Sequence, residues 1–392
     1  MTRLKYKKKL CFITSSRADY GLFSRLLLKC KKKFNIKIIV TGSHLLKSHG
    51  LTIREIRKDG FKNLHKIKIS QENLDTEFDI TKSIAKTMQE FNKFFQKTKV
   101  DLVIVLGDRF EIFSAVLATT IRRIPVAHIH GGETTSNSYD EKFRHAITLM
   151  SQIHFVSAQK YHNRVVQLGK NPKNVYLTGS LGVCNIKNKK IFLKKKKIEE
   201  NFNIKFSKKN IFLIYHPETL HDSYGIEGII NLIQELETFL ETSIIAVSSN
   251  SDTNHVSFNN ILKKASKKIK NFYLIKSLSS NNYISILKHC DIIVGNSSSG
   301  IIEAPSLYMP TVNIGQRQDG RLRSKTIIDV AHDRKSIAVG ISKAFKLIKK
   351  IKKDKKSFTN PYDQGDAVMN IYKILSLKKT YNYIKIKKFY DL

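Results

Sequence analysis

The sequence has no tryptophan, only four cysteines and no Cys-x-x-Cys pair among its 392 residues. The cysteines, at positions 11, 30, 184 and 290, are too widely spaced for a disulfide framework or a zinc knuckle, so we expect reduced, structural thiols. No apolar run approaches the roughly 18 residues of a membrane-spanning helix. The run after the basic N-terminus, residues 10–14, is too short for a signal peptide. These absences predict a cytoplasmic protein without membrane insertion.

Acidic residues are scarce as well: 32 Asp and Glu stand against 70 Lys and Arg, a net charge of +38. Such an excess raises nucleic acid or an anionic membrane as partners. Lysine is spread along the whole chain, however, and no aromatic-and-basic cassette of an RNA-binding fold occurs. We therefore expect no nucleic-acid partner, while the positive field would attract a phosphate-bearing small substrate.

Apolar runs of strand length alternate with amphipathic helical stretches. Residues 101–107 form the most apolar run, which is typical of a strand buried on both faces of a parallel sheet. Further strands are expected at 10–16, 36–41, 125–129, 153–157, 175–178, 210–215, 243–248, 272–275, 291–295 and 311–314. Helices are expected at 21–33, 74–98, 111–122, 142–151, 226–239 and 284–288. The pattern predicts an α/β protein with doubly wound sheets.

The length suggests two or three domains. A Lys- and Asn-rich stretch, residues 185–209, interrupts the alternation and is the expected linker. It separates a Rossmann-like domain over 1–184 from a second one over 210–370. Residues 371–392 are a Lys- and Tyr-rich tail that either packs as a closing helix or frays.

Ligands bind beyond the carboxyl ends of the strands in such sheets, and polar clusters follow several predicted strands. In residues 15–21, backbone N–H groups and Arg17 can hold a phosphate or orient a sugar, or Ser16 or Asp19 simply caps a helix. No GxGxxG motif lies nearby, which counts against a dinucleotide. Asp108 and Arg109 end the most apolar strand and suit proton transfer and anion binding, or a salt-bridged helix start.

The next cluster, residues 128–133, has two histidines and a Gly-Gly turn. His128 and His130 are two apart on a strand, but no third metal ligand is fixed by spacing, so we expect no metal. The Gly-Gly turn presents Glu133 at the edge of a ligand site. Asp140 and Glu141 open a helix, where they either complement the helix dipole or, gathered with other carboxylates, transfer protons.

The second half offers two clusters. His216 ends a strand and faces the expected cleft, although a lone histidine is often structural. Residues 295–303 run from a strand through small polar residues into a helix, so backbone amides and hydroxyls there can cradle a diphosphate. Glu303, about one turn into that helix, is placed to bond ribose hydroxyls.

Together these stretches closely resemble the hydrolysing UDP-N-acetylglucosamine 2-epimerases of bacterial sialic acid synthesis, a branch of the UDP-N-acetylglucosamine 2-epimerase family. The matching stretches follow in order at 16–21, 105–111, 128–133, 139–141, 144–145, 179–182, 216–220, 295–300, 313–315, 317–318 and 320–321. The resemblance implies a GT-B architecture, with a nucleotide sugar between two Rossmann-like domains. It also implies elimination of UDP with loss of the C2 proton, a glycal intermediate, and hydration to N-acetylmannosamine.

The resemblance also implies roles for single residues. The acid/base candidates are Asp108, Glu133, Asp140 and Glu141, with Asp140 the better match of its pair. The candidate substrate and phosphate contacts are Arg17, Asp19, Arg109, His145 and His216. The expected UDP site consists of Ser297, Ser298, Glu303 and Arg317, with Asn250 near the uracil or ribose. No cofactor is implied, and the family suggests a homodimer or homotetramer.

Three alternatives remain. A similar branch hydrolyses UDP-N,N′-diacetylbacillosamine for legionaminic acid, and it shares the stretches 216–220 and 295–300. Residues 139–141 and 180–183 look more like the sialic acid branch, which favours UDP-N-acetylglucosamine. A GT-B glycosyltransferase would share the fold and the UDP site. A non-hydrolysing epimerase fits less well, because the Gly-Gly-Glu and Arg-His features resemble the hydrolysing group.

Overall fold

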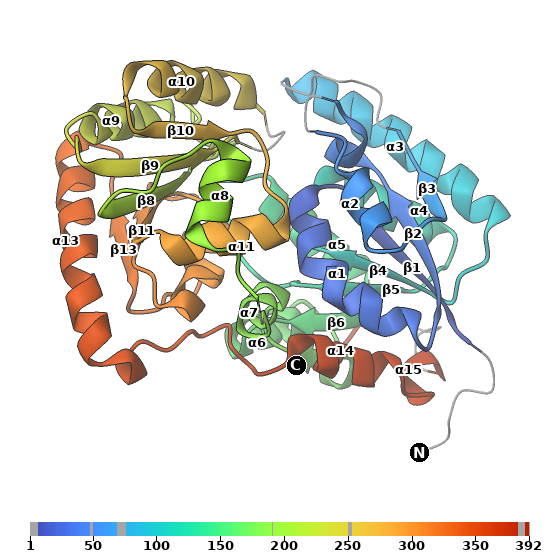
Figure 1. Ribbon diagram of the computed structural model, residues 1–392. Helices are drawn as coiled ribbons and strands as arrows, with labels where there is room; N and C mark the ends of the chain where they lie inside the picture. Colours follow the sequence, from blue (N-terminus) through green and yellow to red (C-terminus); the bar gives the residue numbers. More distant parts are fainter. Residues whose placement is uncertain are drawn as a thin grey trace.

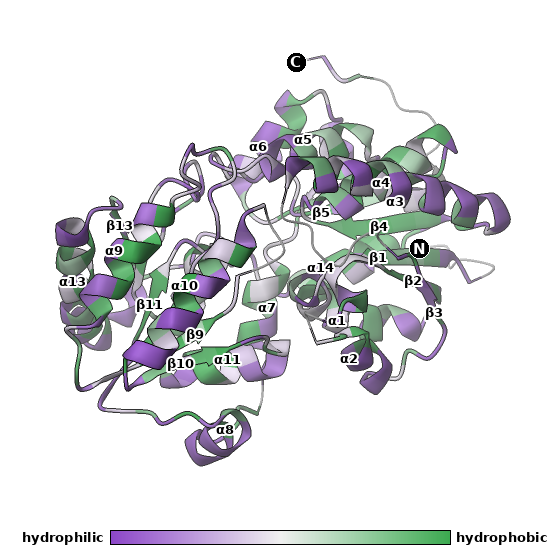
Figure 2. Cartoon of the chain, turned by 90° about the horizontal axis from the view of Figure 1, so that it is seen from above, coloured by the Kyte–Doolittle hydropathy of each residue, from purple (hydrophilic) through white to green (hydrophobic). Residues whose placement is uncertain are grey.

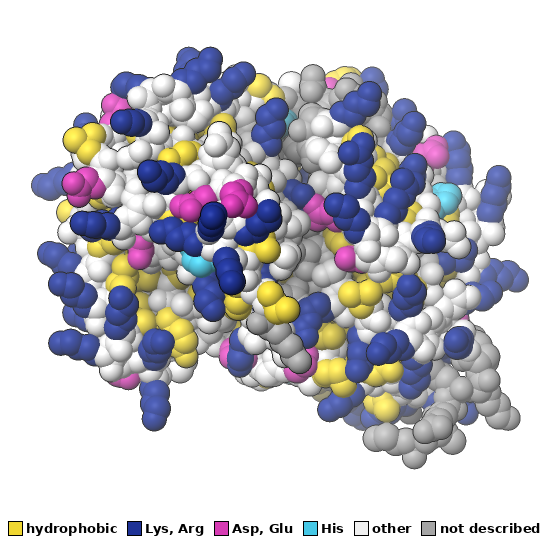
Figure 3. Space-filling view, viewed as in Figure 1, with side chains coloured by type: hydrophobic (Ala, Val, Ile, Leu, Met, Phe, Trp, Pro, Cys, Tyr) yellow, Lys and Arg dark blue, Asp and Glu magenta, His cyan; other side chains and the backbone are white. Residues whose placement is uncertain are grey.

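The computed structural model describes residues 7–47, 50–68, 76–189, 191–249, 253–382 and 389–391. These residues form two lobes, each a parallel β-sheet covered by helices (Figure 1). No helix in the described ranges is long and apolar enough to cross a membrane. Lys and Arg side chains cover both lobes on the face shown in Figure 3 and do not gather in one stripe.

The described part of the N-terminal lobe contains a seven-stranded sheet. Its strands are β1 (Lys9–Thr14), β2 (Asn35–Val40), β3 (Leu64–Lys66), β4 (Leu102–Leu106), β5 (Val126–Ile129), β6 (Ile153–Val156) and β7 (Val175–Leu177), in the order β3-β2-β1-β4-β5-β6-β7. The helices are α1 (Arg17–Lys31), α2 (Ile53–Lys58), α3 (Glu77–Lys97), α4 (Phe110–Ile121), α5 (Asp140–Met150), α6 (Gln159–Gln167) and α7 (Leu181–Lys187). The strand order reverses between β1 and β4, which is where such sheets bind ligands.

The C-terminal lobe repeats this plan with six strands among its described residues. They are β8 (Lys209–Ile214), β9 (Thr242–Val247), β10 (Phe272–Ile275), β11 (Ile292–Gly295), β12 (Thr311–Ile314) and β13 (Ile327–Val330), in the order β10-β9-β8-β11-β12-β13. The helices are α8 (Lys195–Phe202), α9 (Ile226–Leu236), α10 (His255–Lys268), α11 (Ser280–His289), α12 (Ser298–Ile302) and α13 (Arg334–Lys353). Two doubly wound sheets that face each other make a GT-B fold, so the predicted fold class is confirmed.

Apolar strands sandwiched between helices explain why these segments fold as they do. Every residue of β4 is buried, and hydrophobic clusters cover both faces of each sheet. Figure 2 shows the strands as hydrophobic and the outer helix faces as hydrophilic. The two strands that we did not predict, β3 and β13, are edge strands of three and four residues with partly exposed side chains, so they lack the apolar run of a central strand.

The predicted linker region and the C-terminal tail both pack against the lobes. The expected linker, residues 185–209, contains the end of α7 and all of α8, whose Ile198 is buried in the C-terminal core beside Phe212. Helix α14 (Ala367–Leu375) crosses back and packs against α1, where Ile371 and Leu375 join the N-terminal core. Its apolar stripe explains the return, because burying it on the N-terminal lobe removes it from water. A short helix α15 (Lys379–Asn382) follows.

Candidate functional site

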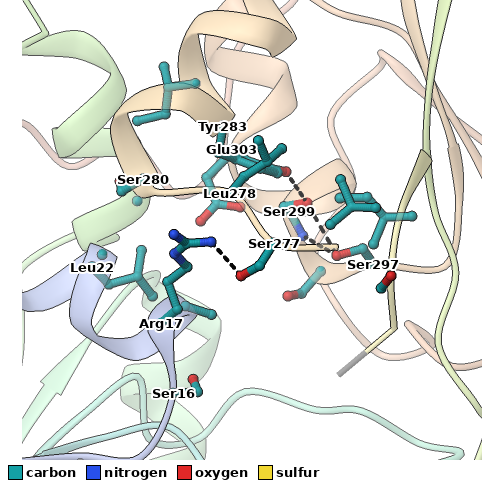
Figure 4. Close-up of a pocket in the computed structure, with 18 of the residues that line it drawn as sticks. Ser16, Arg17, Leu22, Ser277, Leu278, Ser280, Tyr283, Ser297, Ser299 and Glu303 are labelled. Atoms are coloured by element: carbon teal, nitrogen blue, oxygen red, sulfur yellow. Dashed lines mark hydrogen bonds between the residues drawn. The ribbon is translucent and has the colours of Figure 1, made fainter. Parts of the chain in front are cut away.

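A cavity of about 300 Å³ lies between the two lobes, within the size range of small-molecule sites. Both lobes line it: α1 and α7 from one side, and the loops after β8, β9, β10 and β11 from the other (Figure 4). Six of the predicted site residues lie in its wall: Arg17, His216, Ser297, Ser298, Glu303 and Arg317. The carboxyl ends of both sheets therefore meet at one site, as the topology requires.

The turn from β11 into α12 supplies hydroxyls to the cavity. Ser297 is the N-cap of α12, and its Oγ accepts a hydrogen bond from the Ser299 backbone N–H at 3.4 Å. The Ser299 Oγ accepts a bond from the hydroxyl of Tyr283 at 2.6 Å. Among these serines, Ser298 is the one whose hydroxyl has no bond to the described protein atoms, so it can point to a ligand. Small residues at a strand-to-helix turn suit a phosphate.

Glu303 ends this segment at the boundary between the lobes. Burial raises the pKa of its carboxyl to about 7, while Arg321 opposes the rise and Glu133 adds to it. The carboxyl group therefore exchanges its proton near neutral pH. The Glu303 carboxyl group therefore lines the cavity and also senses the charge of a second carboxyl group, that of Glu133.

His216 is fixed from two sides after β8. Its backbone N–H donates to Asn296 Oδ1 at 2.7 Å, while Asn296 Nδ2 donates back to the His216 carbonyl at 2.8 Å. The ring Nδ1 is 3.1 Å from the Ser249 hydroxyl. Arg317 Nη1 lies 3.4 Å from the Asn296 carbonyl oxygen. This network places one imidazole and one guanidinium in the cavity wall.

Arg17 bridges the lobes at the other side of the cavity. Its Nε donates to Glu55 Oε1 of α2 at 2.6 Å, and its Nη1 donates to the hydroxyl of Ser277 in the loop after β10 (Figure 4). Glu55 therefore compensates the charge of the Arg17 guanidinium, and together with Ser277 it fixes the orientation of this group. Glu55 and Ser277 were not predicted, because each is distant in the sequence and neither lies in a motif.

Asp108, two residues after the end of β4, forms an ion pair with Arg144 of α5. The Arg144 side chain is almost fully buried, and its Nη2 also donates to Thr135 Oγ1 at 3.0 Å. Arg144 lies in the stretch 144–145 that carries the family resemblance, but the sequence alone assigns it no role. The pair fixes a carboxylate at the sheet edge, beside the turn that carries Glu133.

Glu133 is almost fully buried and has two firm partners. Ser157 Oγ donates to its Oε1 at 2.7 Å, and Arg321 of the C-terminal lobe lies 3.2 Å from its Oε2. Burial alone would raise the pKa of this carboxyl, but the charges of Arg321 and Arg144 and the hydrogen bond from Ser157 outweigh it, and the pKa falls below its usual value. Glu133 is therefore an ionised carboxylate at neutral pH, able to accept a proton.

The turn before Glu133 has no room for a side chain at position 132, so it needs a glycine there. Gly132 has φ +77°, and a β-carbon there would lie 2.7 Å from the Tyr161 carbonyl oxygen. His130 begins the turn with φ +64°, and its Nε2 accepts from the Leu181 N–H at 3.4 Å. Its Nδ1 then carries the proton, 3.8 Å from Glu133 Oε1. Burial lowers the pKa of His130, so the ring is neutral.

His128 points elsewhere, since its two ring nitrogens contact Thr148 Oγ1 at 3.1 Å and the Gly107 carbonyl at 2.8 Å. The two histidines therefore do not form a pair. Within the described ranges, no group of three His, Cys, Asp or Glu side chains is arranged to hold a metal ion. The chemistry that these residues offer is proton transfer and anion binding.

The predicted Asp140–Glu141 pair opens α5, two residues before the expected start of that helix. Ser138 Oγ donates to Asp140 Oδ2 at 2.9 Å, and the Thr135 N–H donates to Glu141 Oε2 at 2.5 Å. His145 Nε2 lies 3.7 Å from Glu141 Oε1, and burial together with Arg144 lowers the pKa of that histidine. These side chains surround the loop 133–139 and do not line the cavity.

Asp19 and Arg109 form a separate polar group at the ends of β1 and β4. Asp19 is residue N3 of a capping box with Ser16, which starts α1 at Arg17 and not at the expected residue 21. Ser15 Oγ donates to its Oδ2 at 2.7 Å. Arg109 Nε donates to Glu111 Oε2 at 3.1 Å. Neither residue lines the cavity, and Asn250 lies outside the described residues.

Comparison with known proteins identifies the family of the chain. The chain matches the family model for UDP-N-acetylglucosamine 2-epimerase over residues 27–376. It is 36% identical over 395 residues to polysialic acid biosynthesis protein P7 of Escherichia coli, covering 98% of each chain. It is 38% identical over 329 residues to a GDP/UDP-N,N′-diacetylbacillosamine 2-epimerase (hydrolyzing) of Campylobacter jejuni, covering 82% of this chain and 84% of the relative.

Among solved structures, UDP-GlcNAc 2-epimerase from Neisseria meningitidis, bound to UDP-GlcNAc, has the same fold. Its TM-score is 0.75 at 20% identity, with 94% of this chain and 99% of that one covered. The matched length and the two relatives above 30% identity confirm the resemblance seen in the motifs. The chain belongs to the UDP-N-acetylglucosamine 2-epimerase family.

Proposed function

We propose that this protein is a hydrolysing 2-epimerase that converts UDP-N-acetylglucosamine to N-acetylmannosamine and UDP, for sialic acid synthesis. The relative from Escherichia coli, aligned over 98% of both chains, is named for polysialic acid biosynthesis and supports this pathway. The relative from Campylobacter jejuni is named as a hydrolysing epimerase and supports release of the free sugar.

The proposed reaction needs one base and one stabilised leaving group. The C1–O bond breaks, UDP leaves with the electron pair, and the proton on C2 passes to a carboxylate, which gives a glycal. Water then adds its hydroxyl at C1, and C2 takes a proton on the opposite face. Asp108, Glu133, Asp140 and Glu141 are the carboxylates for these transfers. No redox or metal cofactor enters this scheme, because departure of UDP drives it.

The nucleotide end binds to the C-terminal wall of the cavity. The serines at the start of α12 and Arg317 contact the diphosphate, and His216 lies beside them. Arg17 closes the site from the N-terminal lobe, and Glu303 reaches the ribose. Positive groups at the leaving phosphate stabilise the charge that develops there.

The single observation that carries the proposal is that the Arg321 guanidinium pairs with one carboxyl group and acts electrostatically on a second. It pairs with Glu133 at 3.2 Å, and its charge also acts on Glu303 in the cavity wall. The acid/base residues therefore adjoin the proposed UDP site, as a reaction at C1 and C2 of a nucleotide sugar requires.

A second substrate is favoured by a specific observation. The relative at 38% identity is named for GDP/UDP-N,N′-diacetylbacillosamine, whose UDP form differs from the proposed substrate only in its sugar. Both reactions would use the same carboxylates and the same UDP contacts. The two substrates differ in the substituents on the other ring carbons of the sugar.

The decisive experiment is proton NMR of purified protein with UDP-GlcNAc in deuterated water. We expect UDP and free N-acetylmannosamine with deuterium at C2, and no turnover by the Glu133→Gln variant. Turnover of only the diacetylbacillosamine nucleotide would keep the mechanism and change the substrate. UDP-N-acetylmannosamine as product would indicate a non-hydrolysing enzyme, and transfer of the sugar to an acceptor would indicate a GT-B glycosyltransferase.

A further inference from the structure

Arg321 belongs to the C-terminal lobe by sequence but makes its contacts in the N-terminal lobe. It lies in the loop between β12 and β13, and its side chain is buried. Its Nε donates to the Thr134 carbonyl at 2.8 Å, its Nη2 lies 3.4 Å from Thr135 Oγ1, and its Nη2 is 3.2 Å from Glu133 Oε2. The Arg321 guanidinium thus contacts three consecutive residues, 133–135, in the loop that carries the proposed acid/base residue Glu133.

The loop that carries Arg321 is itself anchored. Arg323 Nη1 donates to the carbonyls of Gln318 and Arg321 at 2.8 and 3.1 Å. The Leu322 N–H donates to the Tyr161 hydroxyl of the N-terminal lobe at 3.1 Å. The loop that carries Arg321 is therefore held both within itself and against the N-terminal lobe.

Other charges around Glu133 do not replace this contact. His130 lies 3.8 Å away but is neutral, and Arg144 is already paired with Asp108. Tyr161 and Tyr362 face the same space as uncharged phenols, since burial raises the pKa of both. Glu303 adds a competing carboxyl group. Arg321 is thus the closest cation to Glu133 among the described residues.

We propose that Arg321 is a positioning residue that reaches from the nucleotide-binding lobe to orient the Glu133 carboxylate and supply its counter-charge. The inference rests on the proposed function, in which Glu133 transfers a proton. It follows that Glu133 is oriented and charge-balanced for proton transfer only when the C-terminal lobe is in place. Arg321 itself does not line the cavity, so it acts through Glu133 and not on the nucleotide.

The test compares Arg321→Met with wild type and with Arg334→Met, a control that removes the surface ion pair of Arg334 with Glu235. We expect kcat of Arg321→Met to fall at least about 100-fold, with Kd for UDP within about threefold of wild type. The acid limb of the kcat–pH profile should move up by about one pH unit or more, because Glu133 loses the cation that favours its ionised form. The control should show none of these changes.

Arg321→Lys is a more conservative variant that keeps the inference testable if Arg321→Met does not fold. Lysine keeps the positive charge but lacks the planar guanidinium group. We expect it to lower kcat with a smaller shift of the acid limb. Wild-type pH profiles in both variants, or equal losses of kcat and UDP affinity, would overturn the inference. If wild type turns over neither UDP-sugar, the proposed function fails, and the inference is then judged by NMR titration of ¹³C-glutamate-labelled protein. There the Glu133 signal, assigned with Glu133→Gln, should titrate at higher pH in Arg321→Lys, and an unchanged titration would overturn the inference.

Discussion

The carboxyl group of Glu303 lies directly on the backbone of Gly182, so closely that a β-carbon at position 182 would be 2.1 Å from Glu303 Oε1. Gly182 belongs to α7 of the N-terminal lobe, and Glu303 follows α12 of the C-terminal lobe. Both residues line the cavity. Because Gly182 has no side chain, the Glu303 carboxyl group of the C-terminal lobe can pack against the backbone of the N-terminal lobe.

Replacing that glycine should displace the carboxyl. We expect Gly182→Ala to weaken UDP binding about tenfold or more, because the added methyl group moves Glu303 out of its position. Calorimetry with UDP measures the effect, and Glu303→Ala should cause a similar loss. The double variant should bind no worse than the worse single variant, since both changes remove the same contact. Additive losses would show that Gly182 acts in another way.

The raised pKa of Glu303 predicts how stability depends on pH. Its value in the folded protein is about 7, above the usual 4.5, so the folded state binds this proton more tightly than the unfolded state does. The stabilisation is therefore complete below about pH 4.5 and is lost as the pH rises through 7. A shift of this size corresponds to at most about 3 kcal/mol.

The measurement compares Tm of wild type and Glu303→Gln at pH 5 and pH 8. Wild type should lose stability relative to the variant as the pH rises, since glutamine stays neutral throughout. A constant difference in Tm between the two proteins would contradict the raised pKa.

Ser298 gives a sharper test of the phosphate turn than its neighbours do. Ser297 caps α12 and Ser299 bonds Tyr283, so changing either residue also disturbs the protein. We expect Ser298→Ala to lower UDP affinity about tenfold with Tm unchanged, because its hydroxyl lines the cavity and makes no hydrogen bond to the described protein atoms. Calorimetry and a thermal melt together decide the point, and unchanged affinity would argue against a diphosphate at this turn.

The sequence predicts the sheets well because central parallel strands are buried on both faces. Residues 101–107, for example, stand out as an apolar run and contain β4. Strand ends also mark the candidate site, since Asp108 and His216 lie two residues after the buried strands β4 and β8. What the sequence hides are contacts between the lobes. Arg321 bonds the Thr134 carbonyl across 187 residues, and no local pattern specifies that distance in the fold.

A similar limit applies to the helix boundaries. The helix α1 begins at Arg17 because Ser16 and Asp19 satisfy its first N–H groups, so Arg17 is held in the first turn and directed at the cavity. Apolar spacing alone places the start four residues later, since the first turn is polar. The sequence offers Ser16 and Asp19 as possible caps, and the structure shows that both take part in a capping box.

Asp108→Asn tests a second carboxylate of the proposed acid/base group. The variant keeps an oxygen that Arg144 can reach, but it removes the negative charge and the ability to take a proton. We expect turnover to fall about 10²- to 10⁴-fold, the usual contribution of a positioned acid or base. UDP affinity should change little, because Asp108 does not line the cavity. Asp101→Asn is a suitable control, since it alters an aspartate at the opposite end of β4 that pairs with Lys8. Equal activity in the two variants would remove Asp108 from the mechanism and leave proton transfer to Glu133, Asp140 and Glu141.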